Sequence, residues 1–271
     1  MASIRSATRQ RFPVRLASSF ACRRAVTVVA NSASSNASLE ADMEVRHTHV
    51  AIIPNFVRRI ERSSGSRDEI RRQLGIPADA LVVGTIGNLK AEKRASFFLA
   101  VCNRLHALWR LRSVSTAFPH FIWLGEGTER AAVTTTLAQL PADLRDHIHF
   151  PGASMDVDGY LSAFDAFVLT SAYEGMPNAL LETMAAGLPC VATDVPGTCD
   201  VLNAAADIGI LADAQDPGKF AEQLVRLLAD PARMRMIGEN ARNHVLEHHS
   251  LDQMIAAYSA VFREALERYG N

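Results

Sequence analysis

Two glutamates, Glu174 and Glu182, stand on either side of a turn and the start of a helix in the segment YEGMPNALLETMAAGLPCVATD. Pro177 suits the first position of a helix, because its missing N–H would have no partner there. The helix N-terminus between the two carboxylates attracts anions. Carboxylates accept hydrogen bonds from hydroxyls, while the backbone N–H groups of residues 176–178 suit a diphosphate. The layout predicts a ligand with hydroxyls at both ends and phosphates between them, as in a nucleotide sugar.

An isolated pair of glutamates has a plainer interpretation. Glu174 would then complement the helix dipole, and Glu182 would be an exposed helix residue. The residues around Glu182, ALLETMAAGLP, are nearly all apolar, so most sides of this helix are expected to be buried. A buried carboxylate without a partner is costly, which favours a binding role for Glu182.

A second loop whose residues could bind a ligand is GTIGNLKAEKRASFF. A predicted strand ends at Gly87, a tight turn follows with Asn88, and Lys93 arrives at the start of the next helix. Glycine lets a ligand approach the backbone, and a lysine beside a helix N-terminus favours a phosphate. The alternative is a solvated turn whose lysine contacts nothing.

A third loop, LGEGTER, carries a weaker signal. Gly125 and Gly127 are expected only to end a strand and begin a helix. Thr128 and Glu129 are expected to cap that helix.

The composition sets broad limits on function. The chain has 271 residues, of which 48% are hydrophobic, and a formal net charge of -1. This length allows one large domain or two modest ones. The balanced charge gives no reason to expect nucleic acid as a partner. The scattered cysteines, without metal-ligand spacing, predict no metal site and fit a cytoplasmic compartment.

The first 24 residues carry six arginines, and no acidic residue occurs before Glu40. A transit peptide has such a composition, but Pro13 interrupts any long amphipathic helix. A solvated or membrane-grazing helix face is the preferred interpretation. No window reaches the ~20 apolar residues of a membrane span. We therefore expect a cytoplasmic protein with peripheral contact at the inner face of the membrane.

Short apolar runs rich in Val and Ile alternate with helical patterns, which predicts strand-helix-strand units and a parallel sheet. The predicted strands are Ala25 to Ala30, Val50 to Pro54, Ala80 to Gly87, His120 to Gly125, Ile148 to Gly152, Ala166 to Thr170, Pro189 to Asp194 and Ile208 to Ala212. The predicted helices are Arg94 to Arg112, Glu129 to Leu140, Val157 to Phe164, Ala179 to Ala186, Pro217 to Leu228, Pro231 to His248 and Leu251 to Tyr269, with a short one that Gly75 and Pro77 end. From Ala80 onward this pattern predicts an open, doubly wound α/β domain, whose ligands bind beyond the carboxyl ends of the strands.

The segment YEGMPNALLETMAAGLPCVATDVPG resembles the donor-site signature of the retaining glycosyltransferases of family 4, which have the two-domain GT-B fold. The best match is the pattern of two glutamates separated by seven residues. The order of IIPNFV, VGTIGNLKAEK, WLGEGTER and IHFPGASMDVDGYLSAFDAFVLTSAYEG also agrees with that family. The resemblance runs from about Arg15 to the C-terminus.

The resemblance implies a role for each matching residue. Glu174 would contact hydroxyls of the donor sugar, Glu182 would contact the ribose hydroxyls, and Lys93 would neutralise the diphosphate. Met176, Pro177 and Asn178 would supply backbone near the sugar and diphosphate, and Pro151, Gly152 and Ala153 would meet the base. Gly87, Asn88, Ser171 and Gly175 complete the expected donor-binding set.

The resemblance also implies the reaction. A sugar would move from a nucleoside diphosphate sugar to a glycan or lipid-linked acceptor with retention of anomeric configuration, without a cofactor or metal. We assign no protein nucleophile. Glu174 and Lys93 are the expected catalytic residues, with Glu174 binding and positioning the sugar. Many members have an arginine at the position of Asn88, so stabilisation of the leaving group would depend more on Lys93 and the helix N-terminus.

A second departure from the family concerns the acceptor-binding half. Residues 1–48 resemble only its last helix and strand, residues 49–250 the donor-binding domain, and residues 251–271 a C-terminal helix that packs back on the N-terminal part. His47 and His49 match no catalytic histidine and are expected to be ordinary surface or strand-edge residues.

This departure leaves three interpretations open. The chain is an enzyme, either completed by a separate acceptor-domain chain or part of a longer reading frame in polysaccharide biosynthesis. Alternatively, it is a truncated, non-catalytic protein or subunit that binds a nucleotide sugar. A third interpretation keeps the fold with a different reaction, as in the related sugar-nucleotide epimerases.

Overall fold

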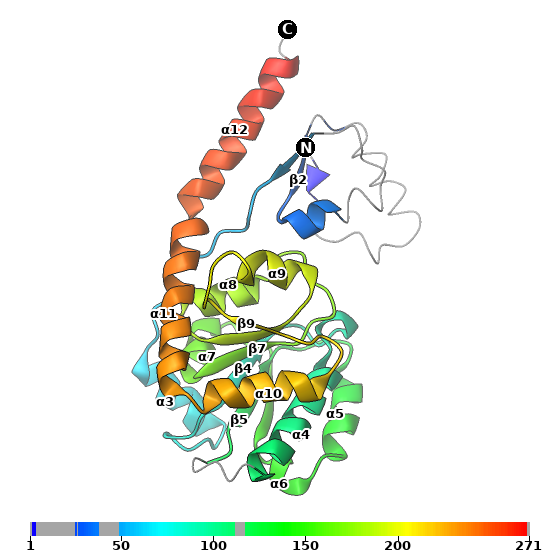
Figure 1. Ribbon diagram of the computed structural model, residues 1–271, viewed down its shortest axis with the longest axis vertical. Helices are drawn as coiled ribbons and strands as arrows, with labels where there is room; N and C mark the ends of the chain where they lie inside the picture. The colour runs from blue at the N-terminus through cyan, green and yellow to red at the C-terminus, as the bar shows by residue number, and fades with distance from the viewer. Residues whose placement is uncertain (1, 4–24, 26, 38–48, 112–116, 270–271) are drawn as a thin grey trace.

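The computed structural model describes residues 2–3, 25, 27–37, 49–111 and 117–269. Most of the predicted basic segment, residues 4–24, lies outside the described residues, as does His47. The described chain contains a large and a small parallel sheet, with helices around the large one (Figure 1).

The large sheet has six parallel strands in the order β6-β5-β4-β7-β8-β9. Their bounds are Val82–Ile86 for β4, His120–Leu124 for β5, Ile148–Gly152 for β6, Ala166–Leu169 for β7, Cys190–Thr193 for β8 and Ile210–Ala212 for β9. The order reverses direction between β4 and β7, which is the switch point where doubly wound sheets bind ligands. The predicted doubly wound α/β fold is confirmed.

The strands form because their residues are apolar on both faces, so each strand can be covered by helices on two sides. All four residues of β7 and all four of β8 are buried. Gly84 in the central strand lies so close to the ring of Phe164 that a Cβ would come within 2.1 Å of it. The absence of a side chain at Gly84 thus lets the ring of Phe164, at the end of α7, pack directly on β4.

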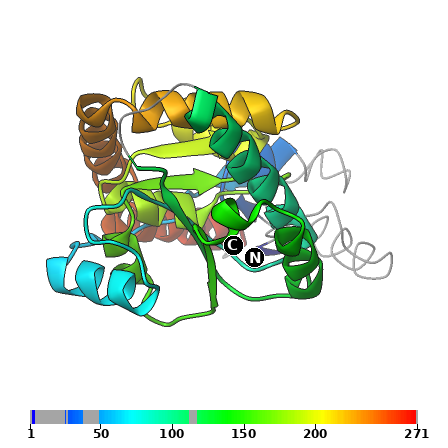
Figure 2. The ribbon, with the colours of Figure 1, turned by 90° about the horizontal axis from the view of Figure 1, so that it is seen from below.

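Two layers of helices cover the sheet (Figure 2). One layer contributes buried residues such as Ile70, Leu161, Leu180 and Val245 to a first core, and the other contributes Phe98, Leu144 and Phe220 to a second core. The first layer consists of α3 (Ser64–Gln73), α7 (Val157–Ala163), α8 (Asn178–Ala185) and α11 (Pro231–His248), and the second of α4 (Ala95–Leu111), α5 (Arg130–Ala138), α6 (Ala142–Arg145) and α10 (Pro217–Leu228). A short helix, α9 (Pro196–Leu202), follows β8.

The sequence predicted the first residues of α10 and α11 correctly, and the structure of the two helix starts shows why. Asp216 accepts hydrogen bonds from the N–H groups of Gly218 and Lys219, and Asp230 accepts one from Arg233. A proline follows each aspartate at the first helical position. An acceptor side chain followed by proline satisfies the N-terminal geometry of a helix.

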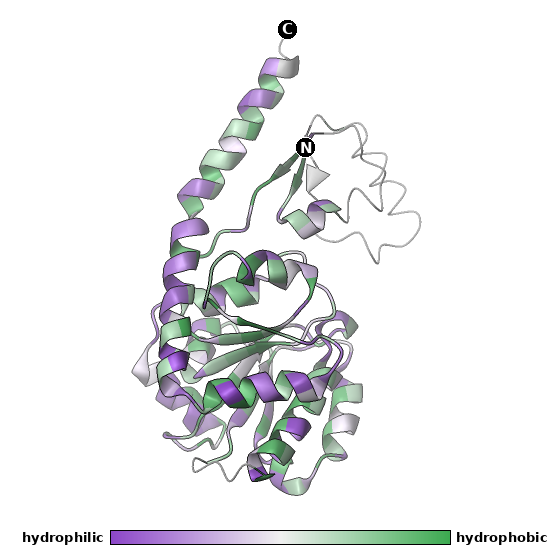
Figure 3. Cartoon of the chain, in the orientation of Figure 1, coloured by the Kyte–Doolittle hydropathy of each residue, from purple (hydrophilic) through white to green (hydrophobic). Residues whose placement is uncertain are grey.

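The small sheet is formed by β1 (Ala2–Ser3), β2 (Thr27–Ala30) and β3 (His49–Ile52). Val29 and Ile53 make a small core with Val261 of the last helix, α12 (Leu251–Tyr269). The C-terminal helix thus contacts the small sheet through Val261. Figure 3 shows the green, apolar strands of the large sheet and the alternation of green and purple along α12.

No described helix is both long and apolar enough to cross a membrane. His49 lies in β3, exposed, with its Nε2 3.9 Å from Glu264, as expected for a strand-edge residue.

Candidate functional site

The loops after β4 and β7 are joined by their backbones at the carboxyl edge of the sheet. The N–H of Ala172 donates to the carbonyl of Glu92 at 2.8 Å, and the hydroxyl of Thr170 donates to the carbonyl of Lys93 at 3.2 Å. Lys93 ends a short 3-10 helix (Ala91–Lys93) in the first of these loops. The two predicted loops therefore form one surface.

Lys93, Ser171 and Glu174 meet on this surface. The Nζ of Lys93 lies 2.5 Å from Oε1 of Glu174, and the hydroxyl of Ser171 donates to the same oxygen at 2.6 Å. The side chain of Lys93 is 24% exposed and that of Glu174 is 10% exposed. A partly buried pair with this hydrogen bond is more strongly coupled than a pair in open solvent. The lysine thus contacts a carboxylate rather than only water.

The backbone of Gly175 is fixed from two sides. Ser32, which follows β2, donates its hydroxyl to the carbonyl of Gly175 at 2.8 Å. Gly197 of α9 lies against the same segment, where a Cβ would come within 2.3 Å of the carbonyl oxygen of Glu174 and 2.5 Å of that of Gly175. Only glycine allows this approach, so α9 and the loop are packed backbone to backbone.

The helix after this loop, α8, begins at Asn178. Pro177 is its N-cap residue, whereas the sequence predicted Pro177 as the first residue of the helix. No side chain caps this helix start, so Pro177 leaves the first N–H groups of α8 without a side-chain acceptor. Asn55 lies in the linker, residues 53–63 between β3 and α3, and contacts both sides of the start of α8. Its N–H donates to the sulfur of Met176, and its side-chain amide donates to Asn178 at 2.6 Å. Free N–H groups at a helix start favour an anion.

Glu182 lies half-buried on α8 beside a charged pair. Arg58 of the linker and Asp158 of α7 form an ion pair at 2.5 Å. Burial raises the pKa of Glu182, the Arg58 guanidinium opposes this rise, and the Asp158 carboxylate adds to it. The predicted burial of Glu182 is confirmed, and Arg58 supplies the nearby positive charge that a buried carboxylate needs.

Gly87 and Asn88 lie after β4, with Asn88 exposed. The indole N–H of Trp123 donates to the carbonyl of Gly87 at 2.8 Å. At Gly125 the backbone has φ of 144°, and a Cβ would come within 2.1 Å of the Gly87 carbonyl oxygen. Gly125 is thus the glycine that allows the β4 and β5 loops to touch.

The prediction for LGEGTER was wrong in two respects. Gly125 and Gly127 do more than end a strand, because a Cβ on Gly127 would come within 2.3 Å of the carbonyl oxygen of Leu89. The helix also begins without a side-chain cap at Glu129, its N-cap residue. Backbone contacts such as Glu129 N–H to the Leu89 carbonyl, 2.9 Å long, hold this helix start instead.

Gly152 is the last residue of β6 and Ala153 follows it at the same edge, and both were predicted to meet a base. Gly152 has φ of 95°, and its carbonyl accepts from the N–H of Gly125 at 2.8 Å. The nearest side chains to a Cβ at Gly152 are those of Glu126 and Arg130, which form an ion pair. Gly152 is buried and Ala153 is exposed, so the loop presents its outer residue to solvent.

Most of the predicted site residues lie in loops or helix starts at the carboxyl edge of the large sheet, whereas Gly152 ends β6, Lys93 ends the short 3-10 helix and Glu182 lies inside α8. The structure shows direct contact among Lys93, Ser171 and Glu174, and places Glu182 with Arg58 and Asp158. Sequence reasoning did not identify Arg58, Asp158, Ser32, Asn55 and Gly197. Three of them, Asn55, Asp158 and Gly197, lie in the sequence segments that resemble the glycosyltransferase family. That resemblance could have identified them.

No group of three or more His, Cys, Asp or Glu side chains is arranged to hold a metal ion within the part of the chain that the structure describes. The carboxylates of this site are instead matched by Lys93 and Arg58.

Known proteins resemble both the sequence and the fold. The chain is 25% identical over 232 residues to N-acetyl-alpha-D-glucosaminyl L-malate synthase of Bacillus anthracis, covering 82% of this chain and 58% of that protein. It is 30% identical over 245 residues to D-inositol 3-phosphate glycosyltransferase of Streptomyces bingchenggensis, covering 86% of this chain and 53% of that protein. The chain thus spans little more than half the length of these relatives.

A similar fold occurs in the crystal structure of Anabaena Alr3699/HepE in complex with UDP and glucose. The TM-score is 0.80 at 18% sequence identity, over 97% of this chain and 70% of that one. The family model described as "Glycosyl transferases group 1" matches residues 80–230, which include β4 to α10 and most of the site. Since this match covers more than half of the sequence, the chain belongs to the group 1 glycosyltransferases.

Proposed function

We propose that the carboxyl edge of the large sheet binds the nucleoside diphosphate sugar of a glycosyl transfer reaction. The observation that carries the proposal is the contact of Lys93 and Ser171 with Glu174 in front of the uncapped start of α8. A cation and free N–H groups suit a diphosphate, and a nearby carboxylate suits sugar hydroxyls. Few other ligands require these three features together.

The remaining predicted residues fit the two ends of the donor. Glu182 would accept hydrogen bonds from the ribose hydroxyls, with Arg58 keeping its carboxylate charged. Gly87, Asn88, Gly152 and Ala153 would supply backbone around the diphosphate and base. Ser171, Gly175, Met176, Pro177 and Asn178 would form the wall near the donor sugar.

In the proposed reaction, the glycosidic bond to the diphosphate breaks as the sugar gains oxocarbenium character. Negative charge grows on the leaving phosphate, where Lys93 and the N–H groups of α8 would stabilise it. Asn88 brings no charge to this task. Glu174 holds hydroxyls of the sugar and positions it, and it does not act as a general base.

We further propose that transfer retains the anomeric configuration. The resemblance of the segment from Tyr173 to Gly197 to the retaining signature supports this proposal. The name of the Bacillus anthracis relative also contains an α-linked sugar, which is the configuration that retention gives from an α-linked donor. NMR of the product anomer tests the proposal: a β-linked product from an α-linked donor would contradict it.

The acceptor is a glycan or a lipid-linked molecule in this proposal, used in polysaccharide assembly in the cytoplasm or at the inner face of the membrane. A separate acceptor-domain chain would supply the acceptor-binding half. The second candidate function is binding of a nucleotide sugar without transfer. It is favoured by Asn88, which brings no charge to a position where many members of the family that the sequence resembles have an arginine.

Binding and transfer are separated by experiment. The purified chain is titrated calorimetrically with UDP, GDP and ADP, and is then assayed for transfer from the sugar of whichever nucleotide binds. Binding with transfer supports the enzyme, and binding without transfer in the presence of candidate acceptor chains supports the second candidate. No binding of any of the three nucleotides contradicts both.

A further inference from the structure

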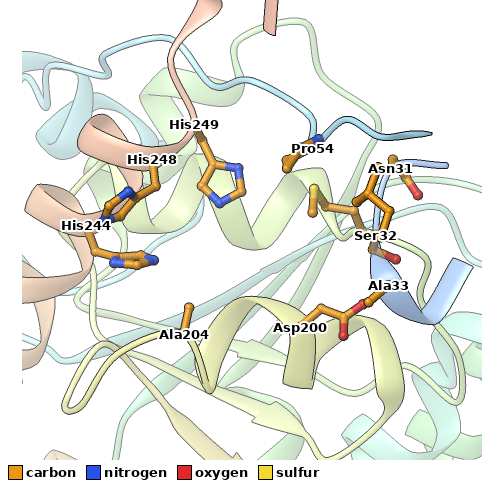
Figure 4. Close-up of a pocket in the computed structure, with 11 residues that line it drawn as sticks. Asn31, Ser32, Ala33, Pro54, Asp200, Ala204, His244, His248 and His249 are labelled. Atoms are coloured by element: carbon orange, nitrogen blue, oxygen red, sulfur yellow. The ribbon is translucent and has the colours of Figure 1, made fainter. Parts of the chain in front are cut away.

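A cavity lies between the small sheet, the loop of residues 170–177 between β7 and α8 (the donor loop) and the end of α11. Its volume is about 440 Å³, which is within the usual range for small-molecule pockets. It is lined by Asn31, Ser32, Ala33, Ile52, Pro54, Met176, Asp200, Ala204, His244, His248 and His249. Figure 4 shows the three histidines on one wall and Asp200 with Asn31 and Ser32 on the other.

The three histidines lie on one wall of the cavity, and the carboxylate that lines it, Asp200, lies on the other wall. The rings of His244 and His248, one helical turn apart, have centroids 4.5 Å apart. The nearest carboxylate to His248 is that of Glu247, which is exposed and 4.0 Å away. Burial lowers the pKa of His244, and the neighbouring imidazoles His248 and His249 lower it further, while Glu247 opposes them.

The position of His249 is fixed by the linker. Its Nδ1 lies 2.9 Å from the carbonyl oxygen of Asn55, which can only accept, so this nitrogen carries the proton. Protonation of the ring therefore occurs at Nε2. Burial lowers the pKa of His249 as well. An anion bound between these rings would offset the free energy that is needed to protonate them.

The opposite wall is polar in a different way. Oδ2 of Asp200 accepts from the N–H of Ser34 at 2.9 Å, which fixes the carboxylate at the start of the helix of residues 33–37. A carboxylate accepts hydrogen bonds and would repel an anion, so this wall suits hydroxyl groups. Ile52, Pro54 and Ala204 provide apolar surface between the two walls.

From this arrangement we propose that the cavity binds a small polyhydroxy molecule that carries a phosphate or carboxylate group. The anionic group lies against His244, His248 and His249, and the hydroxyls lie against Asp200 and Asn31. The cavity is not lined by Lys93 or Glu182, so its ligand binding can be tested separately from nucleotide binding.

The cavity is nevertheless connected to the donor loop. Met176 lines it, and the sulfur of Met176 accepts the N–H of Asn55, whose carbonyl holds His249. Ser32 also lines the cavity and holds the carbonyl of Gly175. A bound molecule therefore contacts residues that position the donor loop.

The test is NMR titration of the histidine rings in the full chain with four probes: inositol phosphate, malate, inorganic phosphate and uncharged inositol. Inositol phosphate is expected to raise the pKa of His244 and His249, and its affinity is expected to fall as the pH rises from about 6 to about 8, because the imidazoles lose their charge. Asp200 and Glu247 are the facing carboxylates whose own titration is followed. The titrations with malate and with phosphate distinguish a carboxylate ligand from a phosphate ligand. Binding of uncharged inositol would contradict the proposal that the ligand needs an anionic group.

Two variants locate the binding. The double variant His244→Gln, His248→Gln is expected to weaken inositol phosphate binding about tenfold or more, as expected for loss of charge-assisted hydrogen bonds. Lys93→Met is the matched control, because it removes the cation of the donor site and leaves the cavity intact. Binding that is lost in Lys93→Met and kept in the double variant would overturn the proposal, as would the absence of any ring response.

A third variant protects the test against misfolding of the double variant. Asp200→Asn keeps an oxygen for the N–H of Ser34 and removes the negative charge facing the cavity. It is expected to strengthen binding of inorganic phosphate and to reduce the preference for inositol phosphate over phosphate. An unchanged ratio of these two affinities would contradict the proposed orientation.

Discussion

The Nζ of Lys93 lies 2.5 Å from Oε1 of Glu174, although 81 positions separate the two residues in the sequence. The contact joins the loop after β4 to the loop after β7, on either side of the point where the strand order reverses. Ser171 donates to the same carboxylate oxygen at 2.6 Å. A bound donor would have to contact both members of this pair, with its phosphate at Lys93 and its sugar hydroxyls at Glu174.

Replacing Lys93 tests the role of the cation. Lys93→Met is expected to lower the transfer rate by about 10²- to 10³-fold, because the leaving phosphate would lose a preorganised charge. Lys90→Met, at an exposed lysine of the same loop, is the matched control and is expected to change the rate little. Steady-state kinetics with circular dichroism as a fold check make the comparison. Equal rates for the two variants would remove Lys93 from the mechanism.

Replacing Glu182 tests the ribose end of the site. Glu182→Gln is expected to weaken UDP binding about tenfold, because a charged acceptor of two hydroxyls is lost. Binding of pyrophosphate, which lacks a ribose, is expected to stay unchanged. Calorimetric titration with both ligands gives the answer. A parallel loss of both affinities would indicate damage to the loop rather than loss of a ribose contact.

The pKa of Glu182 is raised by burial, which gives UDP binding a pH dependence. As the pH falls, this carboxyl group takes up a proton earlier than an exposed glutamate would, and it then loses acceptor capacity. UDP affinity is therefore expected to fall on acidification in the wild type and to fall less in Glu182→Gln. Identical pH profiles for the two proteins would count against the ribose role.

Gly197 tests the backbone packing behind the donor loop. Gly197→Ala places a Cβ 2.3 Å from the carbonyl oxygen of Glu174, so the loop must shift. We expect a loss of about 1–3 kcal/mol in unfolding free energy and weaker donor binding. Gly65→Ala is the control, because the nearest atom to its Cβ is the Ser63 hydroxyl at 3.8 Å. Thermal melts that leave Gly197→Ala as stable as the control would show that the contact is easily relaxed.

A cluster at the other edge of the sheet predicts acid sensitivity. Burial, together with the neighbouring His147, His149 and Arg71, lowers the pKa of His120 to about 4. Between about pH 6.5 and about pH 4 the unfolded chain binds a proton that the folded chain does not, so stability falls as the pH falls through this range.

The loss from His120 is on the order of 3 kcal/mol by pH 4, and its contribution is fully present above pH 6.5. Urea unfolding at several pH values measures it, and His120→Gln is expected to flatten the slope. A slope that is the same in both proteins would show that other groups cause the acid sensitivity.

The fold could be predicted well because its signals are local. Runs of five to eight mostly apolar residues predicted each strand of the large sheet, and aspartate-proline pairs predicted the starts of α10 and α11. Helix α6 was missed because its four residues are too few to show a helical period. Helix α9 was missed because it begins with proline and glycine, which are typical of turns.

The site could be predicted only in part. The sequence indicated Lys93, Glu174 and Glu182 because carboxylates and lysine stand beside glycine and proline at strand ends. Arg58 and Ser32 could not be found in the same way, since they come from the linker and the small sheet, and only tertiary packing brings them to α8. The glycines at 125 and 197 look like turn residues in the sequence, whereas the structure shows that they allow two backbones to touch.

The central claim is that the carboxyl edge of the large sheet binds a nucleoside diphosphate through Lys93 at one end and Glu182 at the other. Calorimetric titration of the wild type, Lys93→Met, Glu182→Gln and the Lys90→Met control with UDP, GDP and ADP tests it most directly. We expect saturable binding of at least one nucleotide by the wild type and Lys90→Met, and about tenfold weaker binding by the other two variants. Binding of equal strength by all four proteins, or by none, would contradict the account.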